Sequence, residues 1–182
     1  ITIPESVTEI GNSAFSGCSK LTSIFIPKNV RTISYGAFSG CSSLSTITVD
    51  EENDYFKAID IILFSKGGTK LIRYAPTKMD IFYSVPDDVI EISDYAFDGC
   101  SHLETIDILN SDVSIGSYAF DGCTSLKSGK IGTIEWNFDK ETGEMTFAGE
   151  GEMMNSGARP WMASVASVKN VFISEGITSI RD

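Results

Sequence analysis

The sequence has little positive charge and no long apolar run. It contains 14 Lys and Arg against 25 Asp and Glu, which gives a formal net charge of −11. An acidic surface repels phosphate backbones and anionic lipid headgroups, so neither nucleic acids nor anionic membrane surfaces are expected as partners. Because no run of about 18 apolar residues occurs, we expect no segment that inserts into a membrane.

Reactive side chains and catalytic motifs are also scarce. The sequence contains no Walker motif, no His-Glu-x-x-His motif and no N-glycosylation acceptor. Gly149 and Gly151 lack the rest of a dinucleotide-binding fingerprint and do not open a predicted helix. His102 is the only histidine, so any Ser-His or Cys-His mechanism would depend on it. With no nucleophile–base pair in the sequence, we expect neither an enzyme nor a bound cofactor.

An eight-residue phrase occurs four times. The copies are AFSGCSKL at 14–21, AFSGCSSL at 37–44, AFDGCSHL at 96–103 and AFDGCTSL at 119–126. The second copy follows the first by 23 residues, and the fourth follows the third by 23. A fixed period of this length predicts a solenoid whose turns, here called rungs, stack on one another. Such proteins mostly present surfaces to partners.

Each phrase leads into a short predicted strand. Leu21, Ile24 and Ile26 show a spacing that recurs in the other copies and ends in a period of two, which predicts alternate burial. Stacked strands should then pair into a parallel sheet. The phenylalanine of each phrase is predicted to fill the centre of its rung, within about one helical turn. The glycine that follows should end that turn in the left-handed conformation.

The four cysteines share one repeat position, as Cys18, Cys41, Cys100 and Cys123. Adjacent strands lie about 4.8 Å apart, within the Cα range that a disulfide tolerates, so disulfides between neighbouring rungs are one alternative. A metal site is less favoured because the spacing matches no zinc pattern. Since a free cysteine is a good small buried hydrophobe, the favoured interpretation is free, buried thiols stacked in two neighbouring pairs.

Two further candidate sites have simpler explanations. His102 shares its repeat position with Lys20, Ser43 and Ser125, so it should face solvent. The acidic run at 50–54 could hold calcium, since hard cations prefer clustered oxygens. It lacks the glycine and the distal glutamate of an EF-hand loop, and a solvated loop is the favoured interpretation.

The wider repeat, I/V-P-x-x-V-x-x-I-x-x-x-A-F-x-G-C-x-x-L-x-x-I-x-I, resembles the BspA-like, or treponemal-type, leucine-rich repeats of large bacterial and protozoan surface proteins. The resemblance covers about 1–127 and 165–182. It implies a right-handed leucine-rich-repeat solenoid, mainly β, with one short strand per rung and short helical turns. It also implies an exported protein at the cell surface. Because the chain begins inside a repeat strand and ends where another phrase is due, we expect it to be a piece of a longer protein.

Two β inserts interrupt the repeat. The segment at about 50–80 resembles a hairpin insert common in this family, with Gly67-Gly68 as its turn. We therefore assign 1–127 to a solenoid that includes this hairpin, 128–164 to a β-rich insert and 165–182 to the truncated resumption of the solenoid.

Two details of the second insert depart from the repeat. Gly129 replaces a core isoleucine, so its rung is predicted to be distorted. Trp161-Met162 stands where Ala-Phe would stand in a regular rung. Lys140–Gly143 is predicted to join two strands.

The candidate binding residues are the strand positions that should point away from the core, on the concave side. They are Ser23, Phe25, Thr46, Thr48, Thr105 and Asp107. Phe25 is an apolar exception among polar neighbours, and an exposed aromatic is a common binding anchor. The alternative is that Phe25 packs against preceding rungs or is simply exposed.

The predicted function is a non-enzymatic interaction or adhesion module of a larger exported protein. The resemblance implies protein partners on a host cell, on a neighbouring cell or in the matrix. The alternative is a passive spacer or stalk that binds nothing itself.

Overall fold

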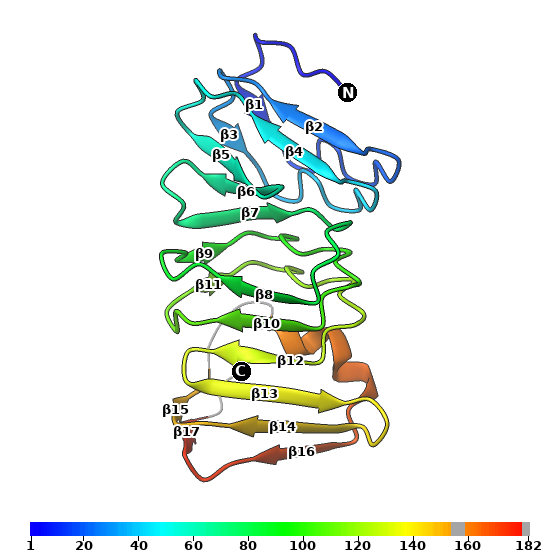
Figure 1. Ribbon diagram of the computed structural model, residues 1–182, viewed down its shortest axis with the longest axis vertical. Helices are drawn as coiled ribbons and strands as arrows, with labels where there is room; N and C mark the ends of the chain where they lie inside the picture. The colour runs from blue at the N-terminus through cyan, green and yellow to red at the C-terminus, as the bar shows by residue number, and fades with distance from the viewer. Residues whose placement is uncertain (154–158, 180–182) are drawn as a thin grey trace.

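The computed structural model describes residues 1–153 and 159–179. In this part the chain forms the predicted β-solenoid; it has about seven turns, rather than the roughly six rungs that the repeats indicated, and almost no helix (Figure 1). The regular turns carry one strand of four residues in a front layer and a shorter strand in a back layer, and the two inserts add further strands to these layers. The expected features of residues 154–158 and 180–182 lie outside the described residues.

The front layer consists of two sheets. Their strands are β2 (Ser23–Ile26), β4 (Thr46–Val49), β8 (Phe82–Val85), β10 (Thr105–Ile108), β12 (Ser128–Ile131), β13 (Ile134–Asp139), β14 (Glu144–Ala148) and β16 (Asn170–Ile173). β2 and β4 pair with each other, whereas the other six form one sheet in the order β16-β14-β13-β12-β10-β8. Figure 1 shows β2 and β4 tilted relative to the lower strands.

The back layer contains the remaining strands. They are β1 (Glu9–Ile10), β3 (Thr32–Ile33), β5 (Phe56–Ile59), β6 (Ile62–Ser65), β7 (Lys70–Tyr74), β9 (Glu91–Ile92), β11 (Ser114–Ile115), β15 (Gly151–Glu152) and β17 (Ile177–Ser179). β1 pairs with β3, β15 with β17, and the others form a sheet in the order β11-β9-β7-β6-β5. One 3-10 helix, η1 (Pro160–Ser167), completes the described elements.

Stacked aromatic rings fill the centres of the rungs, as the repeated phenylalanine predicts. The ring centroids of Phe15 and Phe38 lie 5.8 Å apart, and those of Phe97 and Phe120 lie 5.2 Å apart. The phrase itself forms tight turns, and its glycines have positive φ, for example 74° at Gly17. Such a conformation is open to glycine without a Cβ penalty.

The hairpin insert separates two hydrophobic cores. β5, β6 and β7 pair antiparallel, and β7 then pairs in parallel with β9. Leu63 and Ile72 belong to the N-terminal core, whereas Phe64 and Leu71 belong to the C-terminal core. Because successive strand residues point to opposite faces, β6 and β7 are apolar on both sides. They act as a wall shared by the two cores.

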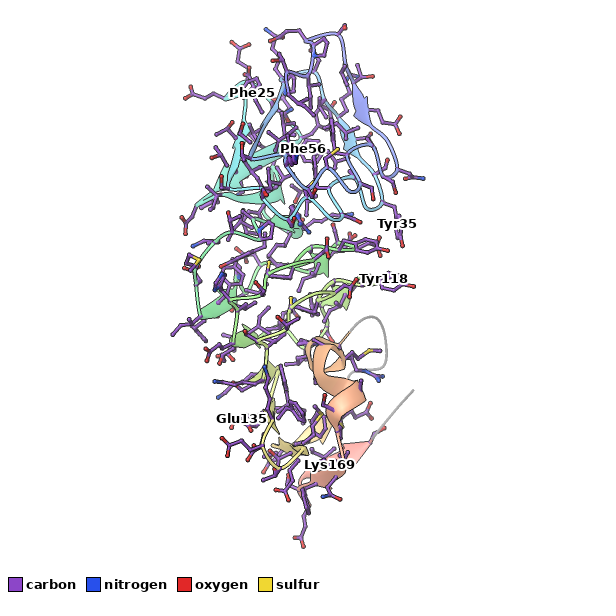
Figure 2. All side chains as sticks on the ribbon, turned by 90° about the vertical axis from the view of Figure 1, so that its right-hand side faces the viewer. Phe25, Tyr35, Phe56, Tyr118, Glu135 and Lys169 are labelled. Carbon is purple, nitrogen blue, oxygen red and sulfur yellow. The ribbon has the colours of Figure 1, made fainter. Side chains whose placement is uncertain are left out.

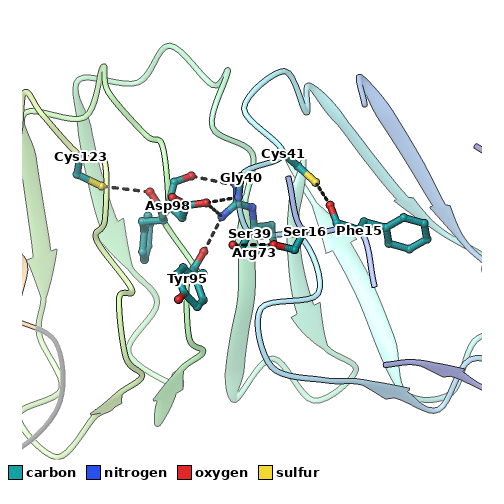
Figure 3. Close-up of polar contacts among 10 residues, drawn as sticks. Phe15, Ser16, Ser39, Gly40, Cys41, Arg73, Tyr95, Asp98 and Cys123 are labelled. Atoms are coloured by element: carbon teal, nitrogen blue, oxygen red, sulfur yellow. Dashed lines mark hydrogen bonds and ion pairs between the residues drawn. The ribbon is translucent and has the colours of Figure 1, made fainter. Parts of the chain in front are cut away.

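Arg73 and Asp98 connect the rungs on either side of this wall. In a regular pair of rungs the glycine of the phrase donates its N–H to a carbonyl of the next rung, as Gly17 does to Ser39 at 2.8 Å. Gly40 donates instead to the Asp98 carboxylate at 2.6 Å. Arg73 Nη2 donates to the Asp98 carbonyl at 2.9 Å. Side chains thus replace a backbone ladder that the insert interrupts (Figure 3).

Two expectations about the second insert are wrong. The rung at Gly129 is regular, because β12 keeps an unbroken register with both β10 and β13. Trp136 lies opposite Gly129 and is buried, so its indole ring fills the space left by the missing isoleucine. A Cβ at Gly129 would overlap the carbonyl oxygen of Ile106. Met162 stands at the position of the core phenylalanine of a regular rung, but it is exposed. In η1 the buried side chain is instead that of Trp161, which packs against Trp136 and Phe147.

The other details of the inserts agree with the sequence. β6 and β7 flank a turn at Gly67-Gly68, and β13 and β14 flank the turn at 140–143. β14 pairs in parallel with β16, so the second insert continues the front sheet. No helix in the described residues combines the length and apolar character that a bilayer crossing requires.

Candidate functional site

The six candidate residues lie on the outward face of the front strands. In β2 the burial alternates, with Ser23 and Phe25 exposed and Ile24 and Ile26 buried. Thr46 and Thr48 are exposed on β4, and the outward positions of β10 are half-buried. Alternation along a strand with one buried face produces this pattern. Figure 2 shows Phe25 and Glu135 along one long side of the molecule, and Tyr35 and Tyr118 along the opposite side.

The structure divides these residues between two sheets. Ser23 lies beside Thr46, and Phe25 lies beside Thr48. Thr105 and Asp107 lie on β10, which belongs to the other front sheet. The four candidates on β2 and β4 therefore form an N-terminal patch. The two candidates on β10, Thr105 and Asp107, belong to a separate C-terminal patch.

The N-terminal patch combines an aromatic ring with carboxylates. Phe25 is 43% exposed and lines a shallow depression together with residues 49–52. Glu52 in this depression forms a 3.2 Å ion pair with Lys28. The hydrogen bond from Lys28 to Glu52 raises the pKa of the Lys28 ammonium. The ring is thus exposed beside an acidic turn.

The acidic run that could have bound calcium is built as a turn. Asp50 Oδ1 accepts the N–H of Glu52 at 2.9 Å. Asn53 is fully buried, and its side chain donates to the carbonyls of Pro27 and Val30 while its oxygen accepts the N–H of Phe56. Asn53 therefore anchors the start of the hairpin insert to the preceding rung.

The C-terminal patch is a polar hollow on β10, β12, β13 and β14. Its residues are Thr105, Asp107, Ser128, Gly129, Lys130, Glu135, Trp136, Asn137, Thr146 and Ala148. Thr105 and Ser128 share a 2.8 Å hydrogen bond between their hydroxyls, and Lys130 Nζ lies 2.6 Å from Glu135 Oε1. The hydrogen bond to Glu135 raises the pKa of Lys130. The hollow offers both donors and acceptors to a polar partner.

Sequence reasoning missed several residues of this outward face. Phe82 on β8 occupies the position that Thr105 occupies on β10 and is 51% exposed. The sequence does contain a signal for this strand: Val85-Pro86 matches Ile26-Pro27, which ends β2, and so indicates that a front strand precedes Pro86. The register with β10 likewise places Ser128 and Lys130 on the outward face.

Three tyrosines form a second line on the opposite side, with Tyr35 and Tyr118 exposed and Tyr95 half-buried between them. The rings of Tyr95 and Tyr118 stack with centroids 5.1 Å apart, and Tyr35 meets Tyr95 edge-on at 5.6 Å. A hydrogen bond with Tyr35 raises the pKa of Tyr95 to about 12. Tyr95 and Tyr118 both have φ of 56°, a conformation that is costly for bulky residues. Sequence reasoning did not identify this line as a surface.

The cysteines take part in packing between rungs. All four are free, with Cys41, Cys100 and Cys123 buried. The thiol of Cys41 donates to the Phe15 carbonyl at 3.1 Å, and that of Cys123 donates to the Phe97 carbonyl at 3.1 Å (Figure 3). Burial raises the pKa of Cys41. Cys18 differs from the expected burial, because it is half-buried.

The single histidine lies apart from both the outward patches and the thiols. His102 is exposed, as its repeat position predicts. It follows Cys100 by two residues, but Cys100 is buried in the core. The two side chains therefore face different environments.

Solved structures of bacterial proteins share this fold. The pneumococcal vaccine antigen PcpA is 25% identical over 84% of this chain and 35% of its own, with a TM-score of 0.58. A leucine-rich cell surface protein of Faecalibacterium prausnitzii is 24% identical over 95% of this chain and 53% of its own, with a TM-score of 0.61. A leucine-rich repeat protein of Eubacterium ventriosum is 23% identical over 97% of this chain and 55% of its own, with a TM-score of 0.65.

The family assignment rests on the repeat itself. This chain spans between 35% and 55% of the length of the three similar structures. No curated protein matches it in sequence. The family model for the BspA-type leucine-rich repeat region matches six copies, over residues 1–69 and 78–152. The chain therefore belongs to the BspA-type leucine-rich repeat family, whose repeats form a module of the kind used in protein interaction.

Proposed function

We propose that this chain is a non-enzymatic binding segment of a larger cell-surface protein, and that it adheres to proteins through the outward face of its front strands. The observation that carries the proposal is the contrast between the two faces of each strand. Most inward positions repeat isoleucine or valine, with Tyr83 and Gly129 as exceptions, whereas outward positions differ between rungs. A scaffold that repeats its core and varies its surface can present a specific combination of side chains.

The composition of the outward face supports a protein partner. Phe25 supplies an aromatic anchor of the kind that dominates binding energy at interfaces. Asp107, Lys130 and Glu135 supply charges that can set orientation and specificity. The names of two similar proteins, a cell surface protein and a vaccine antigen, support a location at the cell surface.

The proposal is tested by surface plasmon resonance against purified matrix proteins and membrane proteins of neighbouring cells. Saturable binding is expected, and Phe25→Ala or Asp107→Lys should weaken it. Loss of an aromatic anchor costs about 2 kcal/mol, or roughly 30-fold in Kd. Tyr118→Ala is the matched control, because Tyr118 is 57% exposed on the opposite side.

Two results would contradict this function. Equal loss of binding in Tyr118→Ala and Phe25→Ala would place the contact elsewhere. Absence of saturable binding to the whole panel would leave a passive spacer as the better description.

A further inference from the structure

We propose that the free edge of β8 is a strand-addition site for an extended segment of a partner protein, one with an apolar centre and Lys or Arg at its ends. This inference rests on the proposed function for the existence of a protein partner. It assigns a place and a chemistry that the outward-face candidates do not include.

β8 is an edge strand inside the solenoid. Front-layer pairing runs from β16 to β8 and stops there, and β2 and β4 form a separate sheet. The three strands of the hairpin insert belong to the back-layer sheet. Among the described residues, no ladder joins β4 to β8. The insert therefore leaves a break in the front layer, and β8 borders it.

The register shows which peptide groups are free. Thr105 N–H donates to the Ile81 carbonyl, and Phe82 lies opposite Thr105. In a parallel sheet the main-chain N–H and C=O of one residue point to the strand on one side, and those of the next residue point to the other side. Tyr83 and Val85 consequently face β10, whereas the main-chain groups of Phe82 and Ser84 face the break. No described residue forms a hydrogen bond with these groups.

Solvent reaches this edge, and the side chains around it are apolar. Met79, Ile81 and Phe82 are 67%, 64% and 51% exposed. Tyr83 is only half-buried, although the equivalent Ile106 on β10 is completely buried. Native proteins normally cover or charge such an edge. An exposed apolar group beside unpaired peptide groups indicates an interaction site.

Charge at the two ends of β8 indicates the chemistry of the partner. Lys78 Nζ lies 2.9 Å from Asp60 and 2.5 Å from Asp80, so this cation is already paired. Asp87 and Asp88 are exposed beyond the other end of β8, after Pro86. Carboxylates at both ends favour a strand with basic ends. In an antiparallel pair with a second copy, the Asp80 end would meet Asp87 and Asp88, and like charges would repel.

Hydrogen exchange tests the free edge without any substitution. The amides of Phe82 and Ser84 should exchange at least about tenfold faster than those of Tyr83 and Val85, which are bonded to β10. Equal protection of all four amides would show that the edge is already covered, and would overturn the inference.

The binding test uses the peptide acetyl-Lys-Val-Thr-Val-Thr-Val-Lys-amide as probe. It should bind the intact chain and slow exchange at Phe82 and Ser84. Ser84→Pro removes the free N–H while leaving the β10 ladder intact, and should weaken binding about tenfold. Ser84→Ala keeps that N–H and should bind as the unmodified chain does. A peptide with Glu at both ends should bind at least about tenfold more weakly.

Three outcomes would overturn the inference. The first is no binding of the basic peptide, and the second is equal binding by Ser84→Pro and Ser84→Ala. The third is a dimer in sedimentation that Ser84→Pro dissociates, since a second copy would then occupy the edge. None of these outcomes affects protein binding that depends on Phe25 or Asp107. The strand-addition site on β8 can therefore be refuted while the proposed function stands.

Discussion

Replacing Asp98 by alanine should uncouple the two halves of the solenoid. The Arg73 side chain is only 2% exposed, and its Nη1 lies 3.7 Å from Asp98 Oδ2. Removing one partner of a buried ion pair costs about 3–5 kcal/mol. The variant also removes the acceptor that holds the Gly40 N–H at 2.6 Å. We therefore expect the free energy of unfolding to fall by about 4 kcal/mol.

The positions of the tryptophans make uncoupling visible. Trp136 and Trp161 are the only two tryptophans, and both lie in the C-terminal core. In urea unfolding, tryptophan fluorescence therefore reports the C-terminal half, whereas far-ultraviolet circular dichroism reports both halves. We expect coincident transitions in the unmodified chain. In Asp98→Ala the dichroism should begin to change at lower urea, because the N-terminal core is smaller, with 15 buried residues against 27 among those that the structure describes.

Control variants separate this effect from a general loss of stability. Lys127→Met removes an exposed ion pair with Glu104, which solvent screens, and should leave the free energy of unfolding nearly unchanged. The double variant Arg73→Met/Asp98→Ala should be less destabilised than the sum of the single variants, because no charge is left buried without a partner. Coincident transitions in Asp98→Ala, or additive losses in the double variant, would refute the role of the pair as the connection between the cores.

Three further results are expected. Gly129→Ala should lower the free energy of unfolding by about 3 kcal/mol in urea, because the new Cβ meets the Ile106 backbone, while Gly67→Ala, with open space around it, should be nearly neutral. Iodoacetamide should alkylate half-buried Cys18 before Cys123, whose pKa is raised by a hydrogen bond with Cys100 and by burial; mass spectrometry showing equal rates would contradict this order. The hydrogen bond from Lys78 lowers the pKa of Asp80, so this carboxylate stabilises the fold above about pH 4 and the contribution is lost as the pH falls through the folded pKa. Asp80→Asn should therefore flatten the pH dependence of stability below about pH 4, and an unchanged profile would argue against it.

The regular rungs were predictable because their signals are local. Ile24, Ile47 and Ile106 repeat at one spacing, and all three are almost fully buried. The same alternation placed Ser23 and Phe25 on the outward face. Where each position faces follows from strand periodicity alone, so no knowledge of distant contacts was required.

The parts that sequence reasoning missed depend on contacts between distant segments. Gly129 indicated a distorted rung because nothing near it in sequence shows that Trp136 fills the space. Arg73 gave no signal, since its carbonyl partners lie 22 and 25 residues away. The break beside β8 follows from where the insert places its strands, which periodicity does not specify.

The shared wall formed by β6 and β7 has a consequence for how such proteins change in length. Each face of the wall completes the core of one neighbouring block, so neither block requires the other to bury its own apolar residues. Whole repeats can then be gained or lost on one side by duplication or deletion while the other side keeps its packing. Such a change has to keep the contacts that cross the wall, among them those that Asp98 forms with Arg73 and with Gly40.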